Sequence, residues 1–399
     1  MTNKSSIKLT QAQSVEIAEA AGKVFQPRTP VNRRDFFAGR WDQMTAINDA
    51  VSETGLHVVI YGERGVGKTS IANVIRPLLH VFDEQRALSE EDARRLVIKI
   101  NASSDDSFTS LWRRALDEIE LPMAIETFGF SPEQIDSSVT LREALGVPDE
   151  MSIDQVRRAL AKLPGSVFVF DEFDRISRSA TWPFTDLIKS LSDYSVDSTI
   201  VLVGVADTVD ELVEDHNSIV RAVVQVPMPR MTPEELSEII QKAEAALEIK
   251  FADDASSRIV RMSQGLPHYT HLVGQNAARR ACQDLSRRVE TSHVNDGFIQ
   301  AVRSANQSVR SVYETAIHSA HPDALYAQVL LACALAAYSS DDSLGYFQAS
   351  QVAGPLGEIL GKNVMISTFN RHLTEFCDKA NRGRVLERKG KARSYRYRF

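Results

Sequence analysis

The sequence predicts an α/β domain built on a parallel sheet, followed by an all-helical segment and then by a C-terminal winged helix-turn-helix domain. Three observations support this prediction. From Val31 to Pro229, short apolar runs rich in β-branched residues alternate with longer amphipathic stretches, a pattern typical of buried parallel strands with crossover helices between them. After Pro229 the pattern becomes helical. Near the end of the chain, three helical patterns precede a basic hairpin.

The composition indicates a globular protein. The chain has 399 residues, of which 43% are hydrophobic and 25% charged, enough for two or three cores. The N-terminus lacks the pattern of a signal peptide, and the longest uncharged apolar stretch, Tyr326 to Tyr338, is too short to span a bilayer. Cys282, Cys333 and Cys377 lie far apart, which argues against a disulfide framework or a zinc site. We therefore expect a cytoplasmic protein with no membrane partner.

The net charge of −7 hides an asymmetry along the chain. Residues 361–399 carry 11 Lys or Arg and 3 Asp or Glu, a balance of +8, whereas residues 1–360 carry 35 and 50, a balance of −15. An acidic body with a basic end is expected when one part of a chain meets a polyanion. A solvated charged tail is the alternative, and composition alone leaves both open.

Five apolar runs of the α/β segment are predicted strands. They are Val58 to Tyr61, Leu96 to Ile100, Val167 to Phe170, Ile200 to Val203 and Val223 to Val226. A crossover helix is predicted from Ile153 to Leu163, because Pro164 and Gly165 follow it.

A phosphate-binding loop follows the first of these runs. The octet from Gly62 to Thr69 matches G-x-x-x-x-G-K-[ST] at every specified position and precedes a helix-like stretch. Glycines let backbone N–H groups converge on anionic oxygens, Lys68 reaches the β and γ phosphates, and the Thr69 hydroxyl ligates Mg²⁺. The residues predicted to bind nucleotide here are Gly62, Glu63, Arg64, Gly65, Val66, Gly67, Lys68, Thr69 and Ser70. A glycine-rich turn that matches by chance is the alternative.

Two carboxylates end the third apolar run, at Asp171 and Glu172. Hydrolysis of a nucleoside triphosphate requires a carboxylate for the metal ion, a base that orients water, and positive charge for the transition state. We predict that Asp171 and Thr69 serve the metal, that Glu172 acts on the water, and that Lys68 supplies positive charge. ATP or ADP with Mg²⁺ is the expected ligand.

With these motifs the chain resembles the AAA+ ATPases, and among them the initiator group of origin-recognition and cell-division-control ATPases and their bacterial relatives. The resemblance implies an α/β P-loop (AAA+) domain with a parallel sheet, an all-helical lid and a winged helix-turn-helix domain. Phe37-Ala-Gly-Arg-Trp41 resembles an F-x-G-R element that lies near the adenine in such families. The resemblance places Arg40 at the nucleotide, with a surface arginine in a structural turn as the alternative.

The resemblance also implies two further polar positions. Its sensor 1 residue, usually Asn, corresponds to Asp207, which as a carboxylate cannot donate to a γ-phosphate unless protonated. Asp207 could also orient a water molecule or cap the next helix. Arg221 stands where many AAA+ proteins carry an arginine finger for the neighbouring subunit, which implies a catalytic role. A salt bridge to acidic residues upstream is the alternative for Arg221.

Gly265-Leu-Pro-His268 departs from the initiator group, which has its sensor 2 arginine in the position of His268. The triplet resembles instead the signal-transduction ATPases with numerous domains, the STAND group, in which the proline approaches the nucleotide. The resemblance thus places Pro267 and His268 at the site. A neutral histidine is a weaker donor than arginine, so we expect slow hydrolysis.

The remaining segments are predicted to be helical until the final hairpin. Thr232, Pro233 and Glu235 form a helix start with a capping box. Further helical patterns run over 252–263, 267–285, 294–319, 324–338, 349–360 and 367–380. We expect an N-terminal extension in residues 1–30, the nucleotide-binding domain in 31–229, the helical lid in 230–305, and the winged-helix domain with its connecting helix in 306–399.

The basic end predicts a nucleic-acid surface. Cationic side chains on a hairpin and an adjacent helix can meet phosphates along one groove. The predicted contacts are Arg371 on the helix and Arg384, Arg388, Lys389, Lys391, Arg393, Arg396 and Arg398 on the wing. Tyr395, Tyr397 and Phe399 are expected to pack under the wing. A wing that binds protein is the alternative.

Two main functional hypotheses follow. In the first, the chain is an ATP-dependent switch that self-associates and engages double-stranded DNA. In the second, it is a STAND-like signalling or scaffold ATPase, in antiphage defence or mobile-element control, whose winged domain binds a protein effector. A kinase-like phosphoryl transferase is a third possibility, disfavoured because no acceptor-binding domain is evident after the loop.

Overall fold

The computed structural model describes most of the chain as two compact units. The described residues are 8–27, 29, 37–86, 95–126, 134–213, 219–303, 307–319, 321, 324–340, 342, 344–390 and 395–399. Unit 2 comprises Ala20–Glu248 and Gly265–His271, and unit 1 comprises Met1–Glu19, Ile249–Gln264 and Leu272–Phe399. The division into four segments predicted from the sequence stays a prediction.

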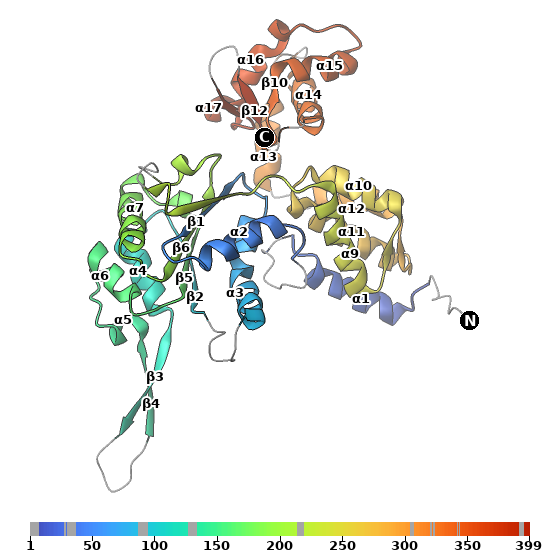
Figure 1. Ribbon diagram of the computed structural model, residues 1–399. Helices are drawn as coiled ribbons and strands as arrows, with labels where there is room; N and C mark the ends of the chain where they lie inside the picture. Colours follow the sequence, from blue (N-terminus) through green and yellow to red (C-terminus); the bar gives the residue numbers. More distant parts are fainter. Residues whose placement is uncertain are drawn as a thin grey trace. The chain divides into compact units, whose positions relative to one another are not determined.

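Unit 2 is built on a five-stranded parallel sheet (Figure 1). Its strands are β1 (His57–Gly62), β2 (Val97–Asn101), β5 (Ser166–Asp171), β6 (Ser198–Val205) and β7 (Val223–Pro227). Four of them contain a predicted apolar run in full, and β2 contains all of its run except Leu96. The strand order is β2-β5-β6-β1-β7. Because β6 lies between β1 and β5, the carboxyl end of β6 is flanked by the phosphate-loop glycine and by Asp171. The predicted parallel α/β core is confirmed.

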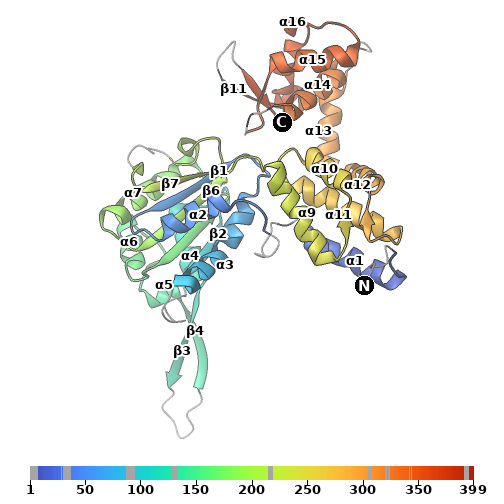
Figure 2. The ribbon, with the colours of Figure 1, turned by 45° about the vertical axis from the view of Figure 1, so that its right-hand side comes forward.

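Helices cover both faces of this sheet (Figure 2). They are α2 (Trp41–Val51), α3 (Lys68–Arg86), α4 (Phe108–Asp117), α5 (Leu141–Ala144), α6 (Ile153–Leu160) and α7 (Arg178–Asp193). Successive strand residues enter different cores: Val167 and Val169 pack with α2 and α3, whereas Phe168 and Phe170 pack with α4 and α7. This alternation follows from the period of two of a β-strand.

Aromatic rings fill the second core. Trp112 of α4 is fully buried and lies 5.1 Å from both Phe168 and Phe170, centroid to centroid. Phe184 of α7 packs edge-on against Phe173 at 5.0 Å. Edge-to-face packing at these distances adds to the stabilisation that burial provides. The cluster therefore fixes α4 and α7 against the strand that ends in Asp171.

A β-hairpin was not predicted from the sequence. Strands β3 (Glu120–Glu126) and β4 (Gln134–Thr140) pair only with each other and extend away from the sheet in both views (Figures 1 and 2). The sequence of β3 includes a proline and no clear alternation of polar and apolar residues, so the usual signal of a half-buried strand is missing.

Helix α9 (Pro233–Leu247) starts as the sequence predicts. It is the last helix before the first segment of unit 2 ends at Glu248. The Thr232 hydroxyl accepts a hydrogen bond from the Glu235 N–H at 3.2 Å, and the Glu235 carboxylate accepts one from the Thr232 N–H at 2.9 Å. The predicted capping box is confirmed.

Unit 1 contains helices α10 (Asp253–Ser263), most of α11 (Pro267–Gln283) and α12 (Thr291–Arg303). Two short strands, β8 (Lys250–Phe251) and β9 (Arg288–Val289), form a parallel pair, so the lid is not all-helical as predicted. The start of α1 (Gln11–Val24) is tied to the end of α11, because the Leu9 N–H donates to the Leu285 carbonyl and the Ser14 hydroxyl to that of Cys282, both at 2.7 Å.

The C-terminal part of unit 1 combines helices with a small antiparallel sheet. The helices are α13 (Gln307–Ile317), α14 (Tyr326–Tyr338), α15 (Ala349–Leu360), α16 (Ile366–Phe376) and α17 (Lys379–Arg382), and the sheet order is β10 (Phe347–Gln348), β12 (Arg396–Arg398) and β11 (Glu387–Lys389). A separate apolar core holds these elements together.

Two predicted helices differ from the structure. The stretch 294–319 contains two described helices, α12 and α13, and 304–306 lie outside the described residues. The helix predicted to reach Ala380 ends at Phe376, because Asp378 caps a new helix by accepting a hydrogen bond from the Ala380 N–H at 2.9 Å.

Within the described ranges, no helix combines the length and the apolar character that a membrane span requires.

The aromatic core yields a stability prediction. Replacement Trp112→Ala should lower the free energy of unfolding by about 3–5 kcal/mol, because it leaves a cavity among buried rings. The control is Trp182→Ala on α7, where the indole is 47% exposed, and the expected loss is under about 1 kcal/mol. Urea unfolding followed by circular dichroism measures both, and equal losses would contradict the assigned core.

Candidate functional site

The phosphate loop connects β1 to α3 through a close backbone approach. A Cβ atom at Gly62 would lie 2.4 Å from the Met228 carbonyl oxygen, so only glycine fits between β1 and the segment after β7. Gly65 and Gly67 have φ values of 89° and 98°, which other residues rarely adopt. Helix α3 begins at Lys68, so its first N–H groups point into the loop.

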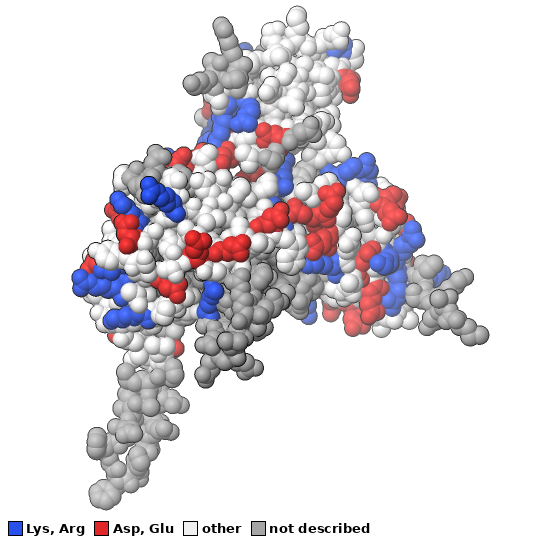
Figure 3. Space-filling model, in the orientation of Figure 1, with Lys and Arg blue, Asp and Glu red and all other residues white. Residues whose placement is uncertain are grey.

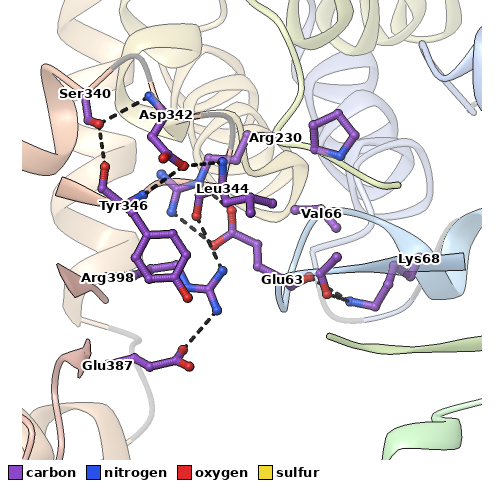
Figure 4. Close-up of polar contacts among 12 residues, drawn as sticks. Glu63, Val66, Lys68, Arg230, Ser340, Asp342, Leu344, Tyr346, Glu387 and Arg398 are labelled. Atoms are coloured by element: carbon purple, nitrogen blue, oxygen red, sulfur yellow. Dashed lines mark hydrogen bonds and ion pairs between the residues drawn. The ribbon is translucent and has the colours of Figure 1, made fainter. Parts of the chain in front are cut away.

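Lys68 is buried within this loop. Its ammonium donates to the Gly62 carbonyl at 2.9 Å and to the Glu63 carbonyl at 2.7 Å (Figure 4). Burial lowers the pKa of Lys68 to about 8, and the nearby carboxylates of Asp174, Asp171 and Glu63 oppose that shift. The ammonium thus lies against two carbonyl groups that a polyphosphate could replace as its partners.

A cavity of about 690 Å³ lies over the loop within unit 2. Twelve of the residues predicted to serve nucleotide or metal line it, namely Arg40, Arg64, Gly65, Val66, Gly67, Lys68, Thr69, Ser70, Asp171, Glu172, Pro267 and His268. Gly62, Glu63 and Asp207 were also predicted at the site and are not among its lining residues. Arg221, which was predicted to serve the site of a neighbouring subunit, does not line it either. The loop, the carboxylates at the end of β5 and the start of α11 are therefore brought together.

Asp171 and Thr69, whose side chains carry oxygen atoms, both line this cavity. The Asp171 Oδ1 atom accepts a hydrogen bond from the Glu172 N–H at 2.9 Å, and Oδ2 lies 3.1 Å from the Lys99 ammonium. No cluster of three or more His, Cys, Asp and Glu that could hold a metal occurs among the described residues. Mg²⁺ fits such a site, since it uses one or two protein oxygens and takes the rest from water and phosphates.

Glu172 adopts a left-handed conformation, with φ of 57°. Its carboxylate lies 2.7 Å from the Arg175 guanidinium. Asp174, between them, accepts a hydrogen bond from the Val205 N–H at 2.8 Å. Asp174 and Arg175 both line the cavity and were missed from the sequence, although they lie only two and three residues after Glu172.

Asp207 lies beyond the cavity edge formed by β6. Its N–H donates to the Glu211 carboxylate at 2.8 Å, while Gly204 and Val205 are the β6 residues that line the cavity. Asp207 thus lies in the loop after β6, outside the residues that line the cavity.

Arg40 is buried and its side chain connects the phosphate loop to the segment after β7. Its guanidinium donates to the Val66 carbonyl at 3.0 Å and to the Pro229 carbonyl at 2.6 Å, and its N–H donates to the Glu235 carboxylate at 2.8 Å. Burial lowers the pKa of Arg40, and Glu235 opposes that shift. Arg40 is therefore a buried bridge between the loop and α9 and not a surface residue.

A second bridge to the loop was missed from the sequence. The Arg230 guanidinium binds the Glu63 carboxylate through two contacts, at 2.6 and 3.1 Å (Figure 4). Both side chains are largely buried. A bidentate pair of this kind fixes orientation as well as distance. Sequence spacing could not indicate it, because 167 residues separate the partners.

The start of α11 contributes Pro267, His268 and His271 to the cavity. Burial lowers the pKa of His271 to about 4, so this imidazole is neutral near pH 7. Phe37, Ala38, Met231 and Ile239 add apolar surface to the cavity. Arg221 lies exposed in the turn before β7 and not at the cavity of its own chain.

The predicted cationic residues of the C-terminal part have mixed surroundings. Arg384 and Arg388 are exposed, with Arg388 stacked over the Tyr395 ring at 4.3 Å. Arg371 is 85% exposed and lies 2.6 Å from Glu375. Arg396 lies 3.2 Å from Asp342. Lys389 is partly buried, and Lys391 and Arg393 lie outside the described residues.

Two predictions about this hairpin were wrong. Arg398 is buried and pairs with Glu387 at 2.9 Å, so it does not line an exposed wing (Figure 4). Of the three aromatic residues, Tyr397 is buried, but Phe399 is 52% exposed. The Arg398 guanidinium also stacks over the buried Tyr346 ring at 4.5 Å, whereas Phe399 lies beyond the end of β12. In Figure 3, Lys and Arg gather at one edge of the C-terminal part, whose surface in this view is otherwise mostly uncharged.

Comparison with known proteins agrees with this architecture. The family model described as Novel STAND NTPase 1 matches residues 28–309. A search of the curated proteins found no match. The Aeropyrum pernix ORC2 protein, solved as ADPNP–ADP complexes, is 12% identical, with a TM-score of 0.50 over 94% of this chain and 93% of that one.

Other solved structures are similar at lower scores. The Aeropyrum pernix ORC1 protein in complex with DNA is 14% identical, with a TM-score of 0.47 over 94% of this chain and 91% of that one. A Thermotoga maritima RuvB mutant is 16% identical, with a TM-score of 0.44 and coverages of 90% and 92%. The predicted AAA+ P-loop fold resembling the origin-recognition group, with STAND-like features, is confirmed.

The buried lysine yields a pH prediction. Without nucleotide the pKa of Lys68 is near 8, so the side chain is charged below that pH and neutral above it. A bound triphosphate would favour the charged form. Nucleoside triphosphate affinity should therefore fall as pH rises, by roughly tenfold one unit above that pKa. Titration calorimetry at about pH 8.5 in two buffers of different ionisation enthalpy should show proton uptake on binding. Binding without proton uptake would contradict the assignment.

Proposed function

The chain belongs to the novel STAND NTPase 1 family, and from this premise we propose that it is a switch that binds ATP with Mg²⁺ and hydrolyses it slowly. One observation carries this proposal. A single cavity joins the phosphate loop, the carboxylates Asp171 and Glu172, and the start of α11. A chance glycine-rich turn would not bring these three segments together.

The residues of the cavity suit phosphoryl transfer to water. Loop N–H groups and Lys68 would bind the β and γ phosphates, and Thr69 and Asp171 would hold Mg²⁺, which neutralises charge on the phosphate oxygens. Glu172 would take a proton from a water whose oxygen bonds to the γ-phosphorus. The bond from that phosphorus to the β–γ bridging oxygen then breaks, and ADP and phosphate leave.

Three features favour slow turnover. Glu172 is ion-paired with Arg175, His268 stands in place of an arginine, and Asp207 does not line the cavity. We propose that Arg221 supplies its charge to the site of a neighbouring subunit, because it lies exposed and away from the cavity of its own chain. Self-association would then be needed for full activity.

The switch would act through α9. Arg40 and the Glu63–Arg230 pair connect the loop to the segment that leads into α9. On the other side, the Gly39 N–H donates to Glu238 at 2.8 Å, and Lys242 donates to the Phe37 carbonyl. A nucleotide that reorders the loop would therefore change the support of this helix.

For the output we propose that the C-terminal part of the chain is a winged helix that engages double-stranded DNA. Its helices, its three-stranded sheet and the exposed Arg371, Arg384 and Arg388 support this. Many of its arginines are paired with acidic or aromatic side chains, and this favours the alternative of a protein effector, as in a signalling ATPase.

Lys68→Ala tests the nucleotide site. The variant should bind ATP at least about 100-fold more weakly, since it loses a charge-assisted contact to phosphates. Lys189→Ala, on an exposed position of α7, is the control and should bind normally. Calorimetry with folded protein measures both, and unchanged ATP affinity in Lys68→Ala would refute the assignment.

The double replacement Arg384→Ala and Arg388→Ala tests the DNA output. Each lost phosphate contact should reduce the slope of log affinity against log salt by about 0.9. Arg158→Ala, a 72% exposed residue of α6, should leave the slope unchanged. Fluorescence anisotropy with labelled duplex at several salt concentrations gives the slopes. Equal slopes for all three proteins would favour the protein effector.

A further inference from the structure

Arg175 is a cation at the nucleotide cavity to which sequence motifs assign no role. It ends the short helix η2 (Phe173–Arg175) and lines the cavity together with Glu172. Its guanidinium lies 2.7 Å from the Glu172 carboxylate, the group proposed above to activate water. The two side chains are 52% and 46% exposed.

The backbone around this pair is fixed from both sides. Phe173 is buried and packs against Phe184, and Asp174 accepts a hydrogen bond from the Val205 N–H. The Arg175 N–H donates to the Glu172 carbonyl at 3.0 Å. Because the turn is held in this way, only the side chains of Glu172 and Arg175 are left to rearrange when a ligand enters.

Two other cations of the cavity, Arg40 and Lys68, are already engaged with the backbone. Arg40 binds two backbone carbonyls behind the loop, and Lys68 binds two more within it. Arg175 differs from these two residues in its partner. Among the described residues its guanidinium is ion-paired with an exposed carboxylate, that of Glu172. Such a pair is weak. A phosphate group carries more charge and more acceptor oxygens, so it can displace the carboxylate.

We propose that Arg175 exchanges partners when ATP binds. Its guanidinium then moves from the Glu172 carboxylate to the γ-phosphate. In the empty site Arg175 neutralises Glu172 and holds it away from water. With ATP bound, Arg175 stabilises the γ-phosphate, and Glu172 is released to accept the proton of the attacking water. Arg175 thereby distinguishes ATP from ADP, a task for which Asp207 and His268 are poorly suited. This inference rests on the proposed ATP site.

The test compares Arg175→Gln with Arg178→Gln. Arg178 is an exposed arginine three residues further on that does not line the cavity. Calorimetry gives the affinities for a non-hydrolysable ATP analogue and for ADP, and phosphate release at saturating ATP gives kcat. Arg175→Gln should bind the analogue roughly tenfold more weakly with ADP affinity unchanged, and kcat should fall by at least about tenfold. Arg178→Gln should match the wild type.

A second variant separates the two partners. Glu172→Gln abolishes the ion pair and should bind the analogue several-fold more tightly than the wild type, because Arg175 no longer has to leave a carboxylate. Replacing Arg175 as well, in the Glu172→Gln variant, should remove this gain in affinity for the analogue.

The outcomes distinguish this inference from the proposed function. Normal Lys68-dependent ATP binding, with an unchanged ratio of ATP to ADP affinity in Arg175→Gln, would overturn the role of Arg175 alone. A wild-type protein that binds neither nucleotide would overturn the proposed function and this inference with it. Unchanged ADP affinity and melting temperature show that Arg175→Gln is folded.

Discussion

The burial of one ammonium group inside a loop of backbone is the constraint on which the site depends. Lys68 keeps its charge below about pH 8 because two carbonyls and three nearby carboxylates compensate for lost water. At the start of the loop, Gly62 allows β1 to approach the Met228 carbonyl oxygen, which a Cβ atom would meet at 2.4 Å. The curvature of the loop is therefore set by the sheet, and the loop in turn is held by Arg40 and by Arg230. Removal of either arginine would leave a buried carbonyl or carboxylate without its partner.

The segment after β5 is constrained in a complementary way. Phe173 enters an aromatic core, Asp174 is tied to β6, and Asp171 is held by the Glu172 N–H and by Lys99. A left-handed residue between these anchors, Glu172, directs its carboxylate toward the cavity. A non-glycine residue in this region costs free energy, and the surrounding packing must offset that cost. Strain of this kind is consistent with a positioned functional group.

The sequence predicted those parts of the molecule whose signals are local. The five strands, the capping box at Thr232 and the phosphate loop depend on runs or spacings within about ten residues, and the structure has them. The Glu63–Arg230 pair and the contact of Leu9 with Leu285 join residues far apart in the chain, so no local pattern indicates them. The hairpin of β3 and β4 was not predicted, because its strands pair only with each other and their sequences lack a clear alternation of polar and apolar residues. Asp174 and Arg175 were missed for a different reason, since their importance follows from the turn that directs them at the cavity.

The balance of charges at the cavity favours a protein that holds ATP over one that turns it over rapidly. A fast hydrolase needs its base free and its transition-state cations in place before the substrate arrives. Here the base is paired with Arg175, and Lys68 is bound to its own loop, so nucleotide binding must first exchange these partners. Each exchange uses part of the binding energy of the γ-phosphate. That part of the binding energy is then not available to lower the barrier to hydrolysis. The same exchange makes the empty and occupied sites differ in structure, and through Arg40 and Glu235 that difference reaches the first turn of α9. In the proposed switch, slow turnover and signalling would thus be two consequences of one arrangement of charges.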